Sequence, residues 1–394
     1  MMELATLDPQ DPQFAVDVVD RLLPMAVELG ASDVHVQPRQ QTWELLMRID
    51  GVLLPIGSLR RVGDSDPVTR LMVLAGLPTY RGGQPMEGRL QWSGHGRDDP
   101  PSLRLGVFPT VHGPRAAIRL MRRNADYDTI DSLGLSDDVT ENLIDLSDQT
   151  DGAILLSGPA GSGKTTTLYA ILRRIAAQTP RRSVMTIEDP VEAVIDTISQ
   201  SELDVASGMT LASALRSAVR QDSEVLLVSE IRDPETAEAA MQASLTGHLV
   251  FSSLHASDVA ASLRRLVQLG VPMHAIRSGV RAIVSQRLLR RLCPQCQGEQ
   301  SRGEQSRGCR QCLGTRYHGR FAIAQCIRLD GSDPAGESLA EALEAGESLH
   351  LMRKGARQAG GMDLFDRVQH SIDLGMTDQS EAYRVLGPNP RTTG

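Results

Sequence analysis

A glycine-rich loop that ends in Lys-Thr is the strongest chemical signal in this sequence. The segment "GPAGSGKT", residues 158–165, satisfies the pattern G-x-x-x-x-G-K-[ST]. Glycines in this pattern turn backbone N–H groups toward one centre at a helix N-terminus, which favours a bound phosphate. Lys164 would reach the outer phosphates of a nucleotide, and Thr165 would ligate Mg²⁺. The alternative is a loop whose glycines serve only its turn. The residues predicted to bind the nucleotide are Gly158, Pro159, Ala160, Gly161, Ser162, Gly163, Lys164, Thr165 and Thr166.

Two acidic segments each follow a short apolar run. In "EVLLVSEIRD" the run 225–228 precedes Glu230 and Asp233, and in "SVMTIEDPVE" the run 184–187 precedes Glu188 and Asp189. Four apolar residues in a row are typical of a buried parallel strand. Acids at the carboxyl ends of such strands would face the nucleotide loop, where a metal and an attacking water need them. The spacing alone is also compatible with acidic residues that lie at solvated strand ends and have no role in a site.

Two histidines flank the next apolar run. His248 precedes residues 249–251 and His255 follows them in "LTGHLVFSSLHASD". The spacing does not match the H-E-x-x-H pattern of metal-binding histidines. Contact with phosphate or water is one interpretation, and a structural histidine is the other.

Four of the five cysteines form two C-x-x-C pairs. Cys293, Cys296, Cys309 and Cys312 lie in "CPQCQGEQSRGEQSRGCRQC", and Cys326 stands apart. This spacing predicts a closed, structural tetrahedral site for Zn²⁺. Redox pairs and unliganded thiols are the alternatives, and a reducing compartment disfavours disulfides. The tandem EQSRG repeat between the pairs predicts an exposed loop, and Cys326 is predicted to be a small buried apolar residue.

These groups require a buried parallel sheet with helices around it. Residues 153–157 are predicted to be a strand that leads into the glycine loop, and residues 166–176 a helix that follows it. A chain of 394 residues is long enough for two domains. It contains no run of 18 apolar residues and starts without a secretory signal, so we expect a cytoplasmic protein.

Charge argues against a nucleic-acid-binding protein. The formal net charge is −8, whereas a chain-wide nucleic-acid footprint needs a basic balance. Residues 281–320 are a basic island with nine arginines and two glutamates. Tyr317 is the only Phe, Trp or Tyr among these arginines, which is too few for a base-stacking surface, so we favour a solvated or partner-facing surface there.

The order of these motifs resembles that of the secretion ATPases that assemble type II secretion pseudopili and type IV pili. The glycine loop, "TIEDPVE", the block from "EIRDPETAEAA" to "LVQLGV" and "QRLLRRLCPQC" match the Walker A, Asp box, Walker B, His box and tetracysteine blocks of that family. The resemblance runs from about Ala31 to Arg320 and implies ATP, Mg²⁺ and Zn²⁺ as ligands.

The resemblance also assigns residue roles. Glu188 corresponds to the Asp-box glutamate proposed to activate water, and Glu230 to the Walker B glutamate beside Mg²⁺. His248 and His255 occupy the His-box positions. Which glutamate is the general base stays open.

Upstream, "ELGASDVHVQP" and "SLRLGVFPTVHGPRAAIRLM" resemble the second, PAS-like N-terminal domain of the family. Arg89, Arg104 and Arg119 stand where the family places arginines that face a nucleotide, and guanidinium groups can bind phosphate bidentately. The alternative is that they lie on the solvent face of a sheet. The alternation in residues 102–110 and 115–121 predicts edge-exposed strands.

We therefore predict an α/β chain with a PAS-like N-terminal domain followed by a RecA-like P-loop ATPase domain. The predicted bounds are 1–123 for the first domain, 124–133 for a linker, 134–394 for the ATPase domain, 293–320 for its zinc element and 337–394 for a helical C-terminal segment.

The resemblance implies a hexameric motor without a transmembrane segment, peripheral at the inner face of the inner membrane. Mg-ATP hydrolysis would drive interdomain motion and, through an inner-membrane platform protein, pilin or pseudopilin polymerisation. The first N-terminal domain of longer members is not matched, so docking would be direct or through an adaptor protein.

Departures from the family pattern keep two alternatives open. Ser229 replaces the usual glycine before the Walker B glutamate, and Gln325 stands where a glutamate is usual. These two departures favour an ATP-binding scaffold protein of the same machinery that hydrolyses ATP only weakly. A nucleic-acid-stimulated RecA-like motor is the other alternative.

Overall fold

The structure is a computed structural model. The chain divides into two compact units, Met1–Arg123 and Asn124–Gly394. The described residues are 7–62, 65–81, 83–92, 101–121, 125–297, 309–389 and 391.

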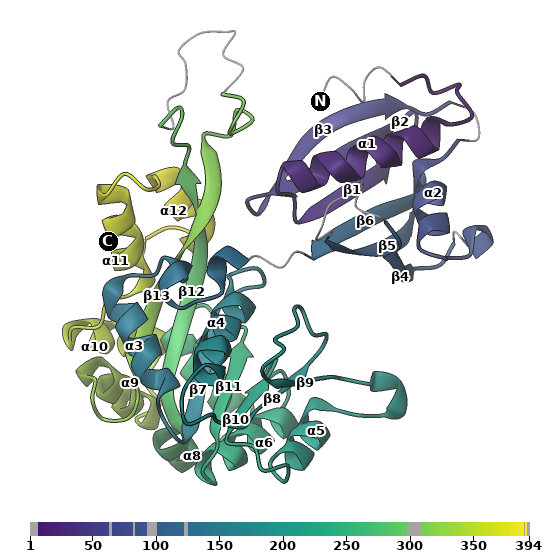
Figure 1. The fold of residues 1–394 in the computed structure, drawn as a ribbon. Helices are drawn as coiled ribbons and strands as arrows, with labels where there is room; N and C mark the ends of the chain where they lie inside the picture. The colour runs from purple at the N-terminus through teal and green to yellow at the C-terminus, as the bar shows by residue number, and fades with distance from the viewer. Residues whose placement is uncertain are drawn as a thin grey trace. The chain divides into compact units, whose positions relative to one another are not determined.

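The first unit is an antiparallel sheet with helices on one face (Figure 1). Its strands follow the order β3-β2-β1-β6-β5-β4. Alternate strand residues pack with α1 and α2 in one core, and the residues between them form the open face. The elements are α1 (Phe14–Glu28), β1 (Asp33–Pro38), β2 (Thr42–Ile49), β3 (Val52–Arg60), α2 (Pro67–Leu74), β4 (Met86–Leu90), β5 (Ser102–Thr110) and β6 (Gly113–Met121).

The predicted edge strands are interior strands. β5 lies between β6 and β4, and β6 lies between β1 and β5. The alternation arises because one face of the sheet is buried and the other is open, which any strand of a half-covered sheet shows. The expectation that these segments are edge strands is therefore wrong.

The second unit contains a mainly parallel sheet with the order β13-β12-β7-β11-β10-β8-β9. Every neighbouring pair is parallel except β12 and β13. The strands are β7 (Gly152–Ser157), β8 (Val184–Glu188), β9 (Ser199–Glu202), β10 (Val225–Val228), β11 (Leu249–Leu254), β12 (Val280–Leu292) and β13 (Tyr317–Arg328).

Helices cover both faces of this sheet. On β7, Ala153 and Leu155 pack in one core with α5–α8, while Ile154 and Leu156 pack in another core with α3 and α4. This double cover explains why every residue of β7, β10 and β11 is buried and why most of them are apolar. The helices are α3 (Asp137–Ser147), α4 (Lys164–Ala176), α5 (Leu211–Ala218), α6 (Pro234–Leu245), α7 (Val259–Gln268) and α8 (Met273–Gly279).

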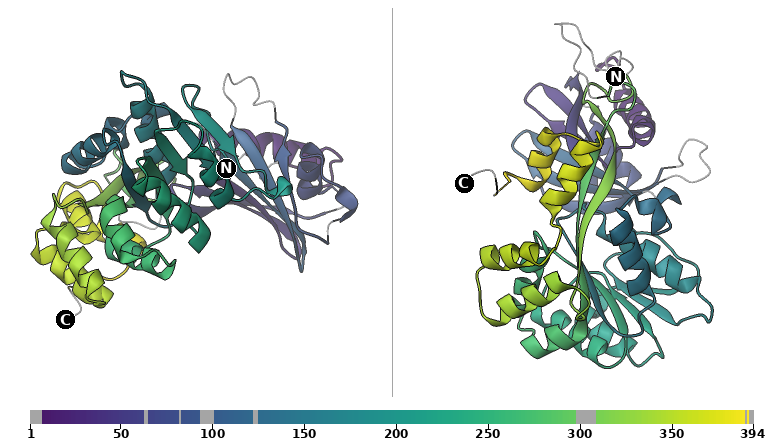
Figure 2. Two further views of the ribbon diagram at one scale, coloured as in Figure 1. Left: turned by 90° about the horizontal axis from the view of Figure 1, so that it is seen from below. Right: turned by 90° about the vertical axis from the view of Figure 1, so that its left-hand side faces the viewer.

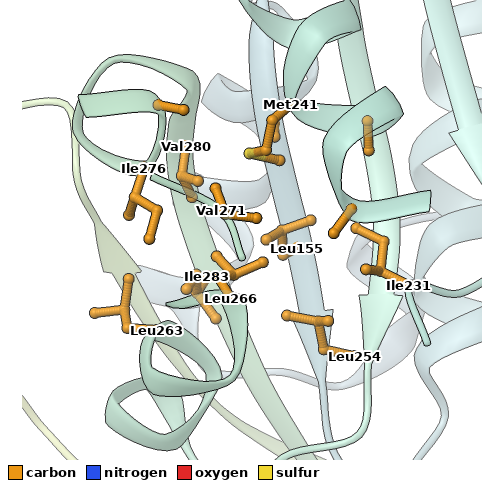
Figure 3. Packing of buried hydrophobic residues seen from close by; sticks show 14 of the residues in the cluster. Leu155, Ile231, Met241, Leu254, Leu263, Leu266, Val271, Ile276, Val280 and Ile283 are labelled. Atoms are coloured by element: carbon orange, nitrogen blue, oxygen red, sulfur yellow. The ribbon is translucent and has the colours of Figure 1, made fainter. Parts of the chain in front are cut away.

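Figure 3 shows the first of these cores from close by. Side chains from β7, β11 and β12 interdigitate there with those of α6, α7 and α8. The labelled residues are Leu155, Ile231, Met241, Leu254, Leu263, Leu266, Val271, Ile276, Val280 and Ile283.

The segment expected to be a linker contributes to the second unit. Ile130 is 3% exposed and Leu133 is 6% exposed, and both belong to the core formed with α3 and α4. Asn124 lies outside the described residues. The part of the segment from residue 130 on is therefore anchored to the second unit.

The C-terminal segment is helical and lies along the β12–β13 hairpin (Figure 2). α11 and α12 pack against β13 and β12 around Leu289, Phe321 and Val368. The elements are α9 (Pro334–Glu344), α10 (Leu349–Gln358), α11 (Leu364–Asp373) and α12 (Gln379–Leu386). Among the described residues, none of the helices combines the length and apolar character that a bilayer-spanning segment needs.

Candidate functional site: a nucleotide loop and a cysteine cluster

The glycine loop connects β7 to α4, as predicted. Gly158, Gly161 and Gly163 have φ angles of 152°, 72° and 90°, and α4 begins at Lys164. A Cβ atom on Gly158 would lie 2.6 Å from the Gln286 carbonyl oxygen, and one on Gly163 would lie 2.7 Å from Gln286 Nε2. Glycine is therefore required at both positions for steric reasons as well as conformational ones.

Gln286 on β12 clamps the loop, and sequence reasoning did not identify it. Its side chain is 2% exposed, Nε2 donates to the Ser162 carbonyl at 2.9 Å, and Oε1 accepts from Thr167 Oγ1 at 2.9 Å. One amide thus fixes the loop and the first turn of α4 together. The only signal was the polar triplet SQR between apolar residues in "VSQRLL", which does not identify the partner of Gln286.

The loop fits a polyphosphate. Lys164 is 9% exposed, and its Nζ donates to the carbonyl oxygens of Gly158 at 2.8 Å and Pro159 at 3.1 Å. Burial lowers the pKa of Lys164, assisted by Arg287 and opposed by Glu230 and Glu192. Among the described residues, buried Ser162 Oγ has no hydrogen-bond partner. A phosphate would satisfy this hydroxyl and the ammonium group.

The other predicted loop residues lie in this cradle. Pro159, Ala160 and Gly161 are exposed at its tip, and Thr165 and Thr166 are in the first turn of α4.

Glu230 lies just beyond the carboxyl end of β10, as predicted. Its Oε1 is 3.0 Å from His255 Nε2, and its Oε2 accepts from Arg232 Nη2 at 2.8 Å. Burial opposes ionisation of Glu230, but Arg232, His255 and Lys164 outweigh it and lower the pKa. A carboxylate kept ionised beside Lys164 is a suitable ligand for Mg²⁺. Ser229 lies before it, with its N–H donating to Ile187 and its carbonyl accepting from Ser253 Oγ.

Glu188 is held differently, in a closed hydrogen-bond network. It ends β8 and is 2% exposed. Its Oε2 accepts from Tyr169 Oη, and its Oε1 accepts from Thr186 Oγ1 at 2.5 Å and Gln200 Nε2 at 3.1 Å. Both oxygens therefore already have protein donors.

A second glutamate of the same motif acts electrostatically on Lys164. Glu192 is exposed, lies four residues after Glu188 in "TIEDPVE", and raises the pKa of Lys164 through its charge. Its presence in the motif was visible, but its exposure and its closeness to Lys164 depend on the fold.

The two histidines lie at opposite ends of β11. His255 follows the carboxyl end and contacts Glu230. His248 precedes the amino end, where its Nδ1 is 3.2 Å from the Ala243 carbonyl oxygen. A strand of six residues separates them, which is about 20 Å. The position of His248 therefore does not support a catalytic role for this residue at the glycine loop of the same chain. Asp233 caps α6, accepting from the Thr236 N–H at 2.8 Å.

The three predicted arginines form one row across the first unit's sheet. Arg89 is the cross-strand partner of Arg104, and Arg104 is the partner of Arg119. Directly opposed residues project from the same face, and all three are exposed. Arg104 pairs with Glu87, and Arg119 Nε donates to Asp33 Oδ1 at 3.2 Å. The open face thus presents three adjacent guanidinium groups.

The four cysteines of the two C-x-x-C pairs converge at the end of the β12–β13 hairpin. Their sulfur atoms all lie within 4.8 Å of one another, and three of the sulfur–sulfur distances are 3.2, 3.5 and 3.8 Å. Tetrahedral Zn²⁺ with Zn–S bonds near 2.3 Å needs sulfurs about 3.8 Å apart, so this donor set fits zinc. The EQSRG repeat between the pairs lies outside the described residues. Cys326 stands apart on β13, where burial raises its pKa to about 12.

Comparison with known proteins agrees with this geometry. The sequence profile of the Type II/IV secretion system protein family matches residues 8–384. The chain belongs to this family. The type II secretion system protein HxcR of Pseudomonas aeruginosa is 36% identical over 379 residues, which cover 96% of this chain and 79% of that protein. The type IV pilus assembly ATPase PilB of Thermus thermophilus is 35% identical over 390 residues, covering 94% of this chain and 43% of that protein.

The fold is similar to that of a solved ATPase. The ATPase DotB of Legionella pneumophila superposes with a TM-score of 0.73 at 22% identity and covers 96% of this chain and 98% of its own. This secretion-family chain is a P-loop ATPase, as the sequence predicted.

Proposed function

We propose that the chain is the Mg-ATP-hydrolysing motor of a type II secretion or type IV pilus assembly system. The observation that carries the proposal is the loop itself, where buried Lys164, unpartnered Ser162 Oγ and ionised Glu230 meet in a chain of the secretion family.

In this proposal, each site residue has one task. Lys164 and the loop amides bind the phosphates, and Thr165 and Glu230 hold Mg²⁺. Mg²⁺ there would neutralise charge on the β- and γ-phosphates. Water oxygen attacks the γ-phosphorus, the bond to the β–γ bridging oxygen breaks, and ADP leaves. The family resemblance assigns the water proton to Glu188, with Glu230 as the alternative base.

The arginine row supplies further phosphate contacts in this proposal. Arg89, Arg104 and Arg119 lie on the first unit, which we assign to the PAS-like domain of the family. In a ring of six copies, these guanidinium groups would bind a nucleotide held by a P-loop. Hydrolysis would release that contact and change the angle between the units.

The partners follow from the relatives. Proteins that are similar over most of this chain are named for type II secretion and type IV pilus assembly. We therefore assign an inner-membrane platform protein as the partner, with docking direct or through an adaptor, and a peripheral location at the inner face of the inner membrane. The basic hairpin around the cysteines would face that partner.

The first experiment measures ATP hydrolysis by the purified protein. Lys164→Ala should reduce turnover at least about 10³-fold, because the ammonium group stabilises charge that develops in the transition state. Lys354, the other lysine of the chain, is exposed on α10 and provides the matched control. Lys354→Ala should leave turnover unchanged. Equal turnover in wild type and Lys164→Ala would refute the proposed site.

A second experiment tests the zinc element. Purified protein should contain one zinc per chain, held by Cys293, Cys296, Cys309 and Cys312 in a closed structural site. Cys296→Ser should lose that metal, whereas Cys326→Ser should keep it. Full zinc content in Cys296→Ser would exclude this site.

A further inference from the structure

The amide of Gln286 fixes the direction of one carbonyl group in the glycine loop. Its Nε2 donates to the Ser162 carbonyl oxygen at 2.9 Å, and its Oε1 accepts from Thr167 Oγ1 at 2.9 Å. Because a carbonyl oxygen can only accept, the NH₂ group must face Ser162, and the amide has one orientation. Gln286 is 2% exposed, so water does not compete for these bonds. The Ser162 carbonyl is therefore held toward β12.

The direction of that carbonyl determines where the next N–H group points. The Ser162 C=O and the Gly163 N–H belong to one planar trans peptide unit, in which the two groups point in opposite directions. With the carbonyl bonded to Gln286, the Gly163 N–H points away from the amide. Within the described part of the chain, this N–H has no hydrogen-bond acceptor. It stands directly before α4, and N–H groups at such a helix start bind phosphate.

The backbone that carries Gln286 is itself held in place. Gln286 lies within β12, and Ala324 of β13 is its cross-strand partner. Arg287 Nη1 donates to the Gln286 carbonyl oxygen at 2.8 Å, and Arg287 Nη2 donates to the Ser257 carbonyl oxygen at 2.5 Å. Ser257 lies between β11 and α7, so the guanidinium group ties Gln286 to a second segment of the carboxyl edge. The sheet, and not the loop, therefore sets the position of the amide.

We propose that Gln286 is a positioning residue for phosphate binding, which turns the Gly163 N–H toward the nucleotide before the nucleotide arrives. This inference rests on the proposed ATPase function and adds to it a residue 124 positions away from Ser162. Backbone N–H groups of this loop type bind the α- and β-phosphates, which are not transferred. The contact is thus equally strong in the bound state and in the transition state, and its loss weakens binding without slowing the chemical step.

Gln286→Met is the first test, because methionine has a similar length and carries no amide. The Kd of a fluorescent ADP analogue with Mg²⁺ should rise about 10-fold, since a hydrogen bond to a charged group is misaligned. The KM for ATP should rise by a similar factor, and kcat should stay within about threefold. A wild-type Kd in folded Gln286→Met would overturn the proposal.

Two further variants separate the two ends of the amide. Gln286→Glu still accepts from Thr167 Oγ1 but cannot donate to the Ser162 carbonyl, so the Kd should rise at least as much as in Gln286→Met. Thr167→Val removes only the bond to Oε1 and should raise the Kd less than about threefold. The reverse order, with the larger loss in Thr167→Val, would mean that the amide supports α4 and does not orient the loop.

Glu381→Gln is the matched control for a general loss of stability on the same strand. Among the described residues, the Glu381 carboxylate bonds to Arg384 and to Arg290, which lies further along β12. Glu381→Gln should unfold more readily, yet its Kd for the ADP analogue should stay within about twofold of the wild-type value, because the two sites share no partner. A rise in Kd equal to that of Gln286→Met would show that affinity only follows strand stability and would refute the positioning role.

Failure of the underlying function looks different. If wild type and Lys164→Ala hydrolyse ATP equally, the proposed ATPase site is refuted, whatever the Gln286 variants do. If Lys164→Ala is inactive and both Gln286 variants bind the ADP analogue as tightly as wild type, only the positioning role is refuted.

Discussion

The two sheets of the molecule carry their charged groups in different places. In the second unit, β7, β10 and β11 are buried along their whole length, and Lys164, Glu230 and His255 lie beyond their carboxyl ends. In the first unit, Arg104 and Arg119 lie within strands, on a face that solvent reaches. A sheet covered on both sides leaves only its edges for chemistry, whereas a half-covered sheet can spread charge across a face.

This difference determines how each site is built. The carboxyl edge gathers groups that are adjacent in space because parallel strands end together, so each group is fixed by its own strand and cap. The arginine row depends on register, since a slip of one residue would turn one arginine into the core. The carboxyl-edge site thus tolerates sequence changes in the segments between its strands, whereas the arginine row does not.

The largest effect expected from this comparison concerns the arginine row. Arg119→Ala should lower kcat for ATP hydrolysis about 10²-fold, because a lost charge-stabilising donor costs about that much. Arg48 lies on the same face, where it pairs with Asp33, the cross-strand neighbour of Arg119. Arg48→Ala should change kcat less than twofold. An equal loss of kcat in Arg119→Ala and Arg48→Ala would show that the positive charge of this face acts generally and that the arginine row has no specific role.

A smaller effect is expected at the two ends of β11. His255→Gln should lower kcat about 10-fold, because it removes the partner of Glu230 Oε1. His248→Gln should have a clearly smaller effect, since His248 is at the amino end of the strand. Steady-state kinetics on the two variants decide this. A larger loss for His248 would place that residue in a nucleotide site formed with another copy of the chain.

The smallest effect on turnover is expected where a buried charge serves structure. Glu381 is fully buried and accepts from Arg384 and Arg290 at the base of the hairpin. Glu381→Gln should cost about 2 kcal/mol of stability, because a neutral amide cannot replace the buried carboxylate that accepts charged hydrogen bonds from half-buried Arg290 and exposed Arg384. Turnover below the unfolding temperature should stay within twofold.

The pH dependence of that loss follows from the pKa of Glu381. Burial opposes its ionisation, but the hydrogen bonds from Arg384 and Arg290 outweigh this and lower the folded pKa below the ordinary 4.5. Its stabilisation is therefore present above about pH 4.5 and is lost as the pH falls through the folded value. Urea unfolding of the wild type and of Glu381→Gln should show that the difference between their free energies of unfolding becomes smaller as the pH falls through this range. A constant difference would indicate that packing, not charge, is lost.

Much of the carboxyl-edge site could be predicted from sequence. The apolar runs before Glu188 and Glu230, and the glycine loop before Lys164, are local patterns that report buried strands and their ends. The cysteine spacing likewise predicted a convergent cluster.

The rest depends on contacts between distant segments. Gln286 bonds to Ser162 and Thr167, more than 100 residues away in sequence. The same holds for the partners of the two glutamates. Glu188 and Glu230 follow similar apolar runs, yet Glu188 accepts from neutral donors such as Tyr169, whereas Glu230 pairs with Arg232 and His255. Sequence patterns place a side chain at a strand end, but neighbouring elements decide which groups satisfy it.

β12 joins the nucleotide loop to the cysteine cluster without a break. The strand runs from Val280 to Leu292. Gln286, near its middle, bonds to the glycine loop, and Cys293 follows directly after its end. Seven residues of extended chain, about 23 Å, separate these two points. β13 pairs with β12 from Ala282 to Leu292, with one irregularity between Arg290 and Leu292. A displacement of the Ser162 carbonyl would therefore pass along a paired two-stranded ribbon toward the cysteine cluster.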